Sequence, residues 1–117
     1  MEPLNYTKHD DVIIIQPDGD LNSCHIMNIE GLLEEIVDPG TITIAVDCRK
    51  LFVLDPSTIS QMAACMKWAA KNSIELVFYN LNPEAQLMFD MMHLGGLFTR
   101  ISGEKFENDY MGSGALN

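Results

Sequence analysis

Short β-branched runs alternate along this chain with segments of helical periodicity, and this alternation constrains the fold more than any other feature. An extended segment from Leu4 to His9 precedes the run Val12 to Ile15, and the two acidic residues between them predict a tight β-hairpin. Further strands are predicted at Thr41 to Asp47, at Ile74 to Tyr79 and at Phe98 to Ile101.

Three helices are predicted between these strands, because apolar positions there recur at helical spacing behind a residue that can cap a helix. In the third helix we expect Leu87, Met88 and Met91 to form the inner face. The predicted helices begin at Ser23, Asp55 and Asn82, and they end at Asp38-Pro39-Gly40, near Lys71-Asn72 and at Gly95-Gly96.

A hairpin followed by alternating helices and strands predicts an α/β fold with a mostly parallel mixed sheet and helices packed mainly on one face. We expect one domain over residues 1–117, with its core at about residues 5–102. Residues 103–117, which include Gly112-Ser113-Gly114, are expected to form a loose tail.

Composition limits the classes of partner. The 117 residues include 17 acidic and 7 basic ones, and a formal charge of −10 opposes binding to nucleic acids or to anionic membranes. No segment has the length of a membrane span and no export signal is seen, so we expect a cytoplasmic protein without membrane insertion. The three cysteines, Cys24, Cys48 and Cys65, lie far apart in the sequence and form no Cys-x-x-Cys motif. We therefore interpret them as buried thiols rather than as part of a disulfide framework or a zinc site.

The residues of the turn Asp55-Pro56-Ser57-Thr58 are all typical of the start of a helix. Asp55 can cap the helix, Pro56 suits its first position, and the hydroxyl groups of Ser57 and Thr58 fall in its first turn. A phosphate on either hydroxyl would meet the positive end of the helix dipole and would add about −1.5 to −2 charges. Serine and threonine are also common there for capping alone, so the residues leave both roles open.

Several motifs in a fixed order resemble one known family. They are Gly19-Asp20-Leu21-Asn22, the strand that closes with Asp47, the turn at residues 55–60, Asn80-Leu81-Asn82-Pro83-Glu84 and Leu94-Gly95-Gly96-Leu97-Phe98. Together they resemble the STAS domain of bacterial anti-sigma factor antagonists over about residues 5 to 102.

The resemblance implies a site. Ser57 matches the serine that a partner kinase phosphorylates in this family, with Thr58 as an alternate acceptor. The implied partner-binding residues are Asp20, Asn22, Asp55, Pro56, Ser57 and Thr58. Pro56 stands where the family often has serine, Thr58 where it often has glycine, and Asn22 where it often has aspartate.

The resemblance also implies a function without catalysis and without a cofactor. The chain would be a phosphorylation-controlled switch in signal transduction and transcription regulation. It would bind a GHKL-type serine kinase that doubles as an anti-sigma factor, would be released when Ser57 is phosphorylated, and would be reset by a PP2C-type phosphatase. The alternative is a constitutive scaffold or subunit of a larger complex.

Three other interpretations receive less support from the residues. One is a receiver domain that is phosphorylated on aspartate, since Asp47 ends a strand as the acceptor of such a domain does. A receiver domain also needs an acidic pair that binds Mg²⁺ after its first parallel strand, and Gln16-Pro17 occupies that place. Cys48 also follows a strand, yet no arginine stands at phosphatase spacing. A sensor of a small ligand or nucleotide remains open, although no phosphate-binding loop is visible.

Overall fold

A five-stranded mixed β-sheet forms the centre of the computed structural model, which describes residues 6–17, 29–51, 56–92 and 99–111. The strands lie in chain order, β1-β2-β3-β4-β5. β1 pairs antiparallel with β2, and the remaining pairs are parallel. The predicted hairpin and mostly parallel sheet are therefore confirmed. The strands are β1 (Tyr6–His9), β2 (Val12–Ile15), β3 (Thr43–Asp47), β4 (Glu75–Tyr79) and β5 (Thr99–Ile101).

The hairpin turn consists of the two acidic residues expected from the sequence. His9 pairs with Val12, so Asp10 and Asp11 alone connect β1 and β2. Asp10 adopts a φ of 56°, a left-handed conformation that aspartate tolerates better than most residues. The carbonyl oxygen of Asp11 accepts hydrogen bonds from the backbone N–H groups of Ile42 and Thr43, which ties the turn to the start of β3.

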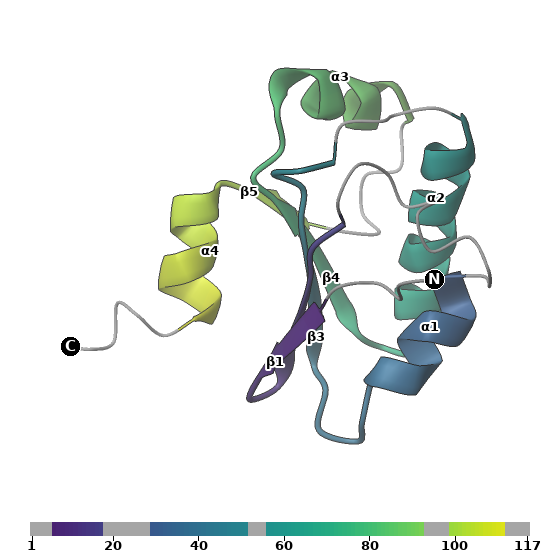
Figure 1. Cartoon of the computed structure of the whole chain (residues 1–117), viewed down its shortest axis with the longest axis vertical. Helices are drawn as coiled ribbons and strands as arrows, with labels where there is room; N and C mark the ends of the chain where they lie inside the picture. Colours follow the sequence, from purple (N-terminus) through teal and green to yellow (C-terminus); the bar gives the residue numbers. More distant parts are fainter. Residues whose placement is uncertain (1–5, 18–28, 52–55, 93–98, 112–117) are drawn as a thin grey trace.

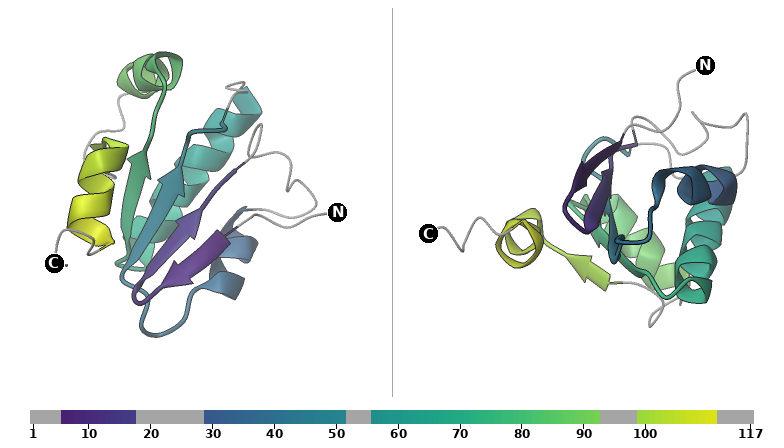
Figure 2. Two further views of the ribbon diagram at one scale, coloured as in Figure 1. Left: turned by 60° about the vertical axis from the view of Figure 1, so that its left-hand side comes forward. Right: turned by 90° about the horizontal axis from the view of Figure 1, so that it is seen from below.

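In the described part of the chain, four helices pack around the sheet: α1 (Ile29–Ile36), α2 (Pro56–Lys71), α3 (Pro83–Met92) and α4 (Gly103–Tyr110). α1 and α2 lie together on one face, α4 lies on the opposite face, and α3 sits above one end of the sheet (Figure 1). The view from below in Figure 2 separates the two helical layers clearly.

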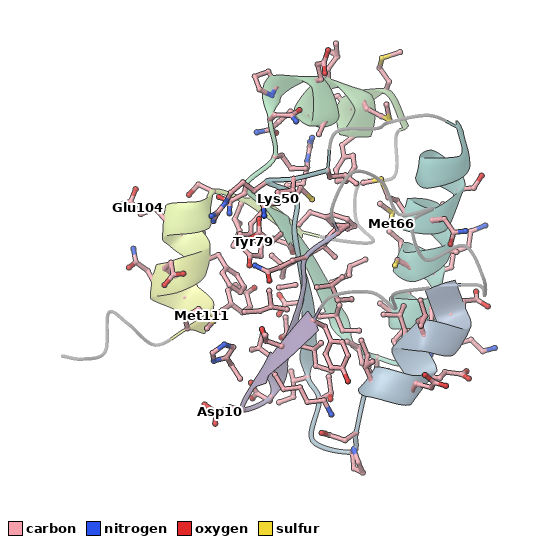
Figure 3. The ribbon with its side chains drawn as sticks, viewed as in Figure 1. Asp10, Lys50, Met66, Tyr79, Glu104 and Met111 are labelled. Carbon is pink, nitrogen blue, oxygen red and sulfur yellow. The ribbon has the colours of Figure 1, made fainter. Side chains whose placement is uncertain are left out.

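Side chains of the central strands alternate between two apolar cores. Ile13 and Ile15 of β2 face the core beneath α1 and α2, whereas Val12 and Ile14 face the core beneath α4. The strands are consequently apolar at nearly every position, which is typical of a sheet covered on both faces. Met62 and Met66 of α2 are fully buried in the larger core, where flexible thioether side chains fill the space against the sheet. Figure 3 labels Met66 between α2 and the sheet.

α4 corrects the expectation of a loose tail after residue 102. The helix is capped by Ser102, whose Oγ accepts a hydrogen bond from the backbone N–H of Lys105 at 3.1 Å. Phe106 is 1% exposed and stacks on Tyr79 of β4, with 4.0 Å between the ring centroids. The hydroxyl of Tyr110 donates to Glu75 Oε2 at 2.8 Å. The segment is mostly polar, so its pair of aromatic residues four positions apart is the main signal of a docked helix.

α3 corrects a second expectation. Its start is as predicted, because Asn82 Oδ1 accepts a hydrogen bond from the backbone N–H of Ala85 at 2.8 Å. Its inner face, however, is formed by Ala85 and Phe89, and the ring of Phe89 meets that of Phe78 edge-on at 5.0 Å. Leu87 and Met91, which were expected inside, are 61% and 69% exposed.

The contribution of α4 can be measured by removing its buried ring. Phe106→Ala should lower the free energy of unfolding by about 3–5 kcal/mol, because the change deletes a fully buried aromatic side chain. Urea denaturation followed by circular dichroism gives this value. Lys105→Ala is the control and should change stability by less than about 0.5 kcal/mol, since that side chain is exposed. Equal stability of the two variants would show that α4 does not cover the sheet.

Candidate functional site

The switch region predicted from the sequence begins where expected. α2 starts at Pro56, so Ser57 and Thr58 occupy its first turn. This turn lies at the end of the sheet where the parallel strands β3 and β4 finish (Figure 1). Asp20, Asn22 and Asp55 lie outside the described residues, as do the side chains of Pro56, Ser57 and Thr58. Their role as a partner-binding surface stays a prediction.

Three polar residues meet at this same carboxyl end of the sheet. Asp47 is the last residue of β3, while Gln16 and Asn80 directly follow β2 and β4. Asn80 Nδ2 donates to Asp47 Oδ1 at 3.1 Å, and Gln16 Nε2 donates to Asp47 Oδ2 at 3.4 Å. One buried carboxylate, 6% exposed, therefore joins three adjacent strand ends.

Arg49 is a third partner of the carboxylate. Its backbone N–H donates to Asp47 Oδ1 at 3.0 Å and turns the chain away from β3. Its guanidinium group lies 3.7 Å from Asp47 Oδ2, but the side chain is 70% exposed. The backbone bond holds the turn, whereas the exposed guanidinium group contributes little to stability.

Asn80 also contacts the beginning of α4 closely. Asn80 has a φ of 61°, which asparagine tolerates, and its side chain lies against Gly103. A Cβ atom at Gly103 would overlap Asn80 Oδ1. Gly103 therefore permits the close approach of α4 to the strand end and leaves room for the Asn80 side chain, which donates to Asp47.

A hollow of about 570 Å³ opens between α4 and the sheet, and we call it the α4 hollow. Its walls come from β1 to β4 and from α4, and they include Gln16, Asp47, Tyr79, Glu104, Glu107 and Met111. Glu104 and Met111 lie near opposite ends of α4, with Tyr79 between the helix and the sheet (Figure 3). Sequence analysis missed this hollow because its outer wall is the helix that was expected to be a tail.

Tyr79 lines the hollow with a neutral hydroxyl group. Burial raises the pKa of the phenol well above its ordinary value, and the negative charge of Asp47 raises this pKa further. Tyr79 therefore keeps its proton throughout the physiological range. The hydroxyl can donate one hydrogen bond and accept others.

The alternatives based on catalysis receive no support from the geometry. Burial raises the pKa of the Cys48 thiol strongly, and the neighbouring charge of Asp47 raises this pKa further, so the nucleophilic thiolate is disfavoured. Cys48 and Cys65 are buried thiols, as predicted, and Cys24 lies outside the described residues. Beside Asp47 stands the amide of Gln16 rather than an acid. Within the described ranges, no group of acidic, cysteine or histidine side chains could hold a metal ion.

The order of motifs, the mixed sheet and the start of α2 agree with a single family. The family model of the STAS domain matches residues 3–109. This chain belongs to the STAS domain family. The matched residues extend through most of α4, so the helix lies within the STAS domain. No match was found among proteins with curated functions.

Solved structures with the same fold include three from bacterial regulatory systems. A serine-to-glutamate variant of RsbS from Moorella thermoacetica has a TM-score of 0.75 and 17% identity, and the match covers 99% of this chain and 100% of that one. A chain of the stressosome, described as a signal integration and transduction hub, has a TM-score of 0.71 and 17% identity, with coverage of 94% and 98%. Phosphorylated SpoIIAA, a cell fate determinant of Bacillus, has a TM-score of 0.65 and 16% identity, with coverage of 90% and 96%.

At such identities these structures establish the STAS fold, and roles of particular residues need separate support. Among the helices that the structure describes, none is long and apolar enough to cross a membrane.

The contact between Gly103 and Asn80 can be tested with a double-mutant cycle. Gly103→Ala should cost about 1–3 kcal/mol of stability, because the new methyl group must displace the Asn80 side chain or α4. In an Asn80→Gly background, where glycine suits the positive φ, the same change should cost nearly nothing. Urea denaturation of the four proteins measures both values. An equal cost in both backgrounds would contradict the proposed contact.

Proposed function

We propose that this STAS domain is a non-enzymatic, phosphorylation-controlled protein-interaction switch of the anti-sigma factor antagonist type, with Ser57 as its phosphorylated residue. The observation that carries the proposal is the start of α2 at Pro56, which puts Ser57 in the first turn of a sixteen-residue helix within the family match. The fold shared with SpoIIAA, a protein whose phosphorylated form is known, supports the same assignment.

The first turn of a helix suits such a switch for physical reasons. Its backbone N–H groups have no partners inside the helix, and the helix dipole is positive there. A phosphate on Ser57 would be stabilised by these groups and would leave the fold intact. The same phosphate would add negative charge to the surface on which a partner docks, and it would weaken docking by repulsion and by the cost of desolvation.

Exposed apolar side chains on α3 extend this surface. Leu87 and Met91 stand four residues apart on the solvent side of α3, at the same end of the molecule as the start of α2 (Figure 1). Arg100 of β5 contacts α3 through a 2.8 Å ion pair with Asp90. Exposed apolar residues on a positioned helix are typical of protein-binding surfaces.

The proposed partners follow from the resemblance and from the charge. A GHKL-type serine kinase that is also an anti-sigma factor would bind the unphosphorylated domain in the cytoplasm and transfer phosphate to Ser57. A PP2C-type phosphatase would remove the phosphate. A net charge of −10 favours a kinase surface with basic residues, which would speed association and would be opposed by an additional phosphate.

A second candidate function is that of a constitutive scaffold in a larger assembly. It is favoured by the fold shared with a stressosome chain. In that case Ser57 would only help to start α2, and its phosphorylation would not control binding. The two functions differ in their response to a negative charge at Ser57.

Binding of charge variants to the partner kinase tests the switch. Ser57→Ala should bind the kinase as tightly as the unphosphorylated native chain does. Ser57→Asp should bind the kinase at least about tenfold more weakly, because like charges meet at the interface. Ser73→Asp is a matched control, because it adds the same charge in an exposed position beyond the far end of α2. Affinity is measured by calorimetry, and phosphate is mapped by mass spectrometry after incubation with the kinase and ATP.

The outcomes separate the two candidate functions. Phosphate on Ser57, retained in a Thr58→Ala variant and lost in Ser57→Ala, supports the switch. Equal affinities of Ser57→Asp and Ser73→Asp would contradict it and favour the scaffold.

A further inference from the structure

A groove between α1 and α2 carries charged side chains that the proposed switch does not use. The two helices lie side by side on the face of the sheet opposite α4 (Figures 1 and 2). The groove has a volume of about 170 Å³, and we call it the α1–α2 groove. A water molecule occupies about 30 Å³ in the liquid, so the groove suits a ligand of only a few heavy atoms. Its lining residues are Glu30, Glu34, Lys67, Trp68, Lys71 and Asn72.

The charges of the groove are separated by sign. Glu30 and Glu34 stand one turn apart on α1, and Lys67 and Lys71 stand one turn apart on α2. The seven basic residues of the chain all lie in the described ranges, and four of them form an ion pair. With the described residues, neither the two lysines nor the two glutamates of the groove form one. Two carboxylates and two ammonium groups therefore line one groove without pairing directly.

The indole of Trp68 is a second, independent indication of a ligand. Trp68 is 5% exposed and lines the groove. Its Nε1 can only donate, and among the described residues it is the buried side-chain nitrogen or oxygen without a hydrogen-bond partner. Buried polar groups normally have a partner, and a ligand with an acceptor oxygen would supply one. The exposed, flexible side chains of Lys67 and Lys71 can rearrange to admit it.

The polar group at the end of α2 is already engaged. Asn72 Nδ2 donates to the carbonyl oxygen of Trp68 at 2.8 Å, and the backbone N–H of Asn72 donates to the same oxygen. These bonds fix the last turn of α2 beside the groove. The donors left for a ligand are therefore the two ammonium groups and the indole N–H, and the charged acceptors are the two carboxylates.

This set of groups selects for the charge of the ligand. A simple anion would be attracted by the lysines but repelled by the carboxylates, and a simple cation would meet the reverse. A molecule that carries both charges finds a complementary group at each end. Hydrogen bonds between charged groups are also shorter and stronger than those between neutral groups.

We propose that the α1–α2 groove binds a small zwitterion of the free amino-acid class. Its carboxylate is held by Lys67, Lys71 and the indole N–H of Trp68. Its ammonium group is held by Glu30 and Glu34. The ligand bridges α1 and α2 on the face away from α4. This inference goes beyond the proposed switch and is independent of Ser57 and of the partner kinase.

Titration of the full-length chain with glycine tests the proposal, and Trp68 reports on binding because it is the only tryptophan in the chain. Its indole resonance in a ¹H–¹⁵N spectrum should move downfield as a hydrogen bond to the carboxylate forms, and the movement should saturate. Acetate and methylamine each keep one of the two charges. Both should bind at least about tenfold more weakly than glycine, because each lacks the hydrogen bonds of the other charged group.

Removal of a charge from the groove should weaken glycine binding. Lys71→Gln and Glu34→Gln should each do so by about tenfold, since each loses a hydrogen bond between charged groups. Lys50→Gln and Glu84→Gln are the matched controls, because they remove the same charges at exposed positions outside the groove. Both controls should bind glycine with nearly native affinity.

Four outcomes would overturn the proposal. They are shifts that do not saturate, an indole resonance that stays in place, equal weakening by the groove variants and their controls, and binding of acetate or methylamine as tight as that of glycine. The last would indicate a site for a simple ion. Because the titration contains no kinase, its outcome is independent of the Ser57 experiment.

Discussion

Both faces of the central sheet are apolar, and the rest of the structure depends on covering them. The side chains of β2, β3 and β4 are buried on both sides, so a single helical layer would leave Val12, Ile14 and Val77 in water. α1 and α2 cover the larger core, and α4 covers the smaller one with one buried ring, Phe106. The C-terminal helix is therefore part of the fold. The helix also forms one wall of the α4 hollow.

The parallel arrangement of β2, β3 and β4 collects polar groups at one end of the sheet. Side chains that follow parallel strands meet at a common edge, and ligand sites in α/β proteins tend to lie there. Here the buried carboxylate of Asp47 takes its donors from the ends of the two neighbouring strands. α2 begins beyond the same edge, so the first turn of α2 and the buried Asp47 carboxylate belong to this end of the molecule, whereas the α4 hollow extends along the helix from Glu104 to Met111 (Figure 3).

Much of this fold could be predicted from the sequence, since its strands and first three helices have strong local signals. The β-branched run of β2 and the Asp55-Pro56 start of α2 illustrate such signals. The missed elements depended on contacts distant in sequence. Phe106 is buried because Tyr79 lies opposite, and no local pattern shows that pairing. On α3, Phe89 faces inward to meet Phe78, which turns Leu87 outward. The sequence predicts Asp47 as the last residue of a strand. Its hydrogen-bond donors, Gln16 and Asn80, can be identified only when the order of the strands in the sheet is known.

The close approach of Gly103 to Asn80 has a consequence for how this domain can diverge. Any side chain at position 103 competes for space with the amide that holds Asp47, so the two positions cannot vary independently. A relative that carries alanine or a larger residue at 103 must have a smaller residue at 80 or a shifted helix. Correlated substitutions at positions 80 and 103 among related sequences would therefore show that α4 packs closely against the strand end in those proteins as well.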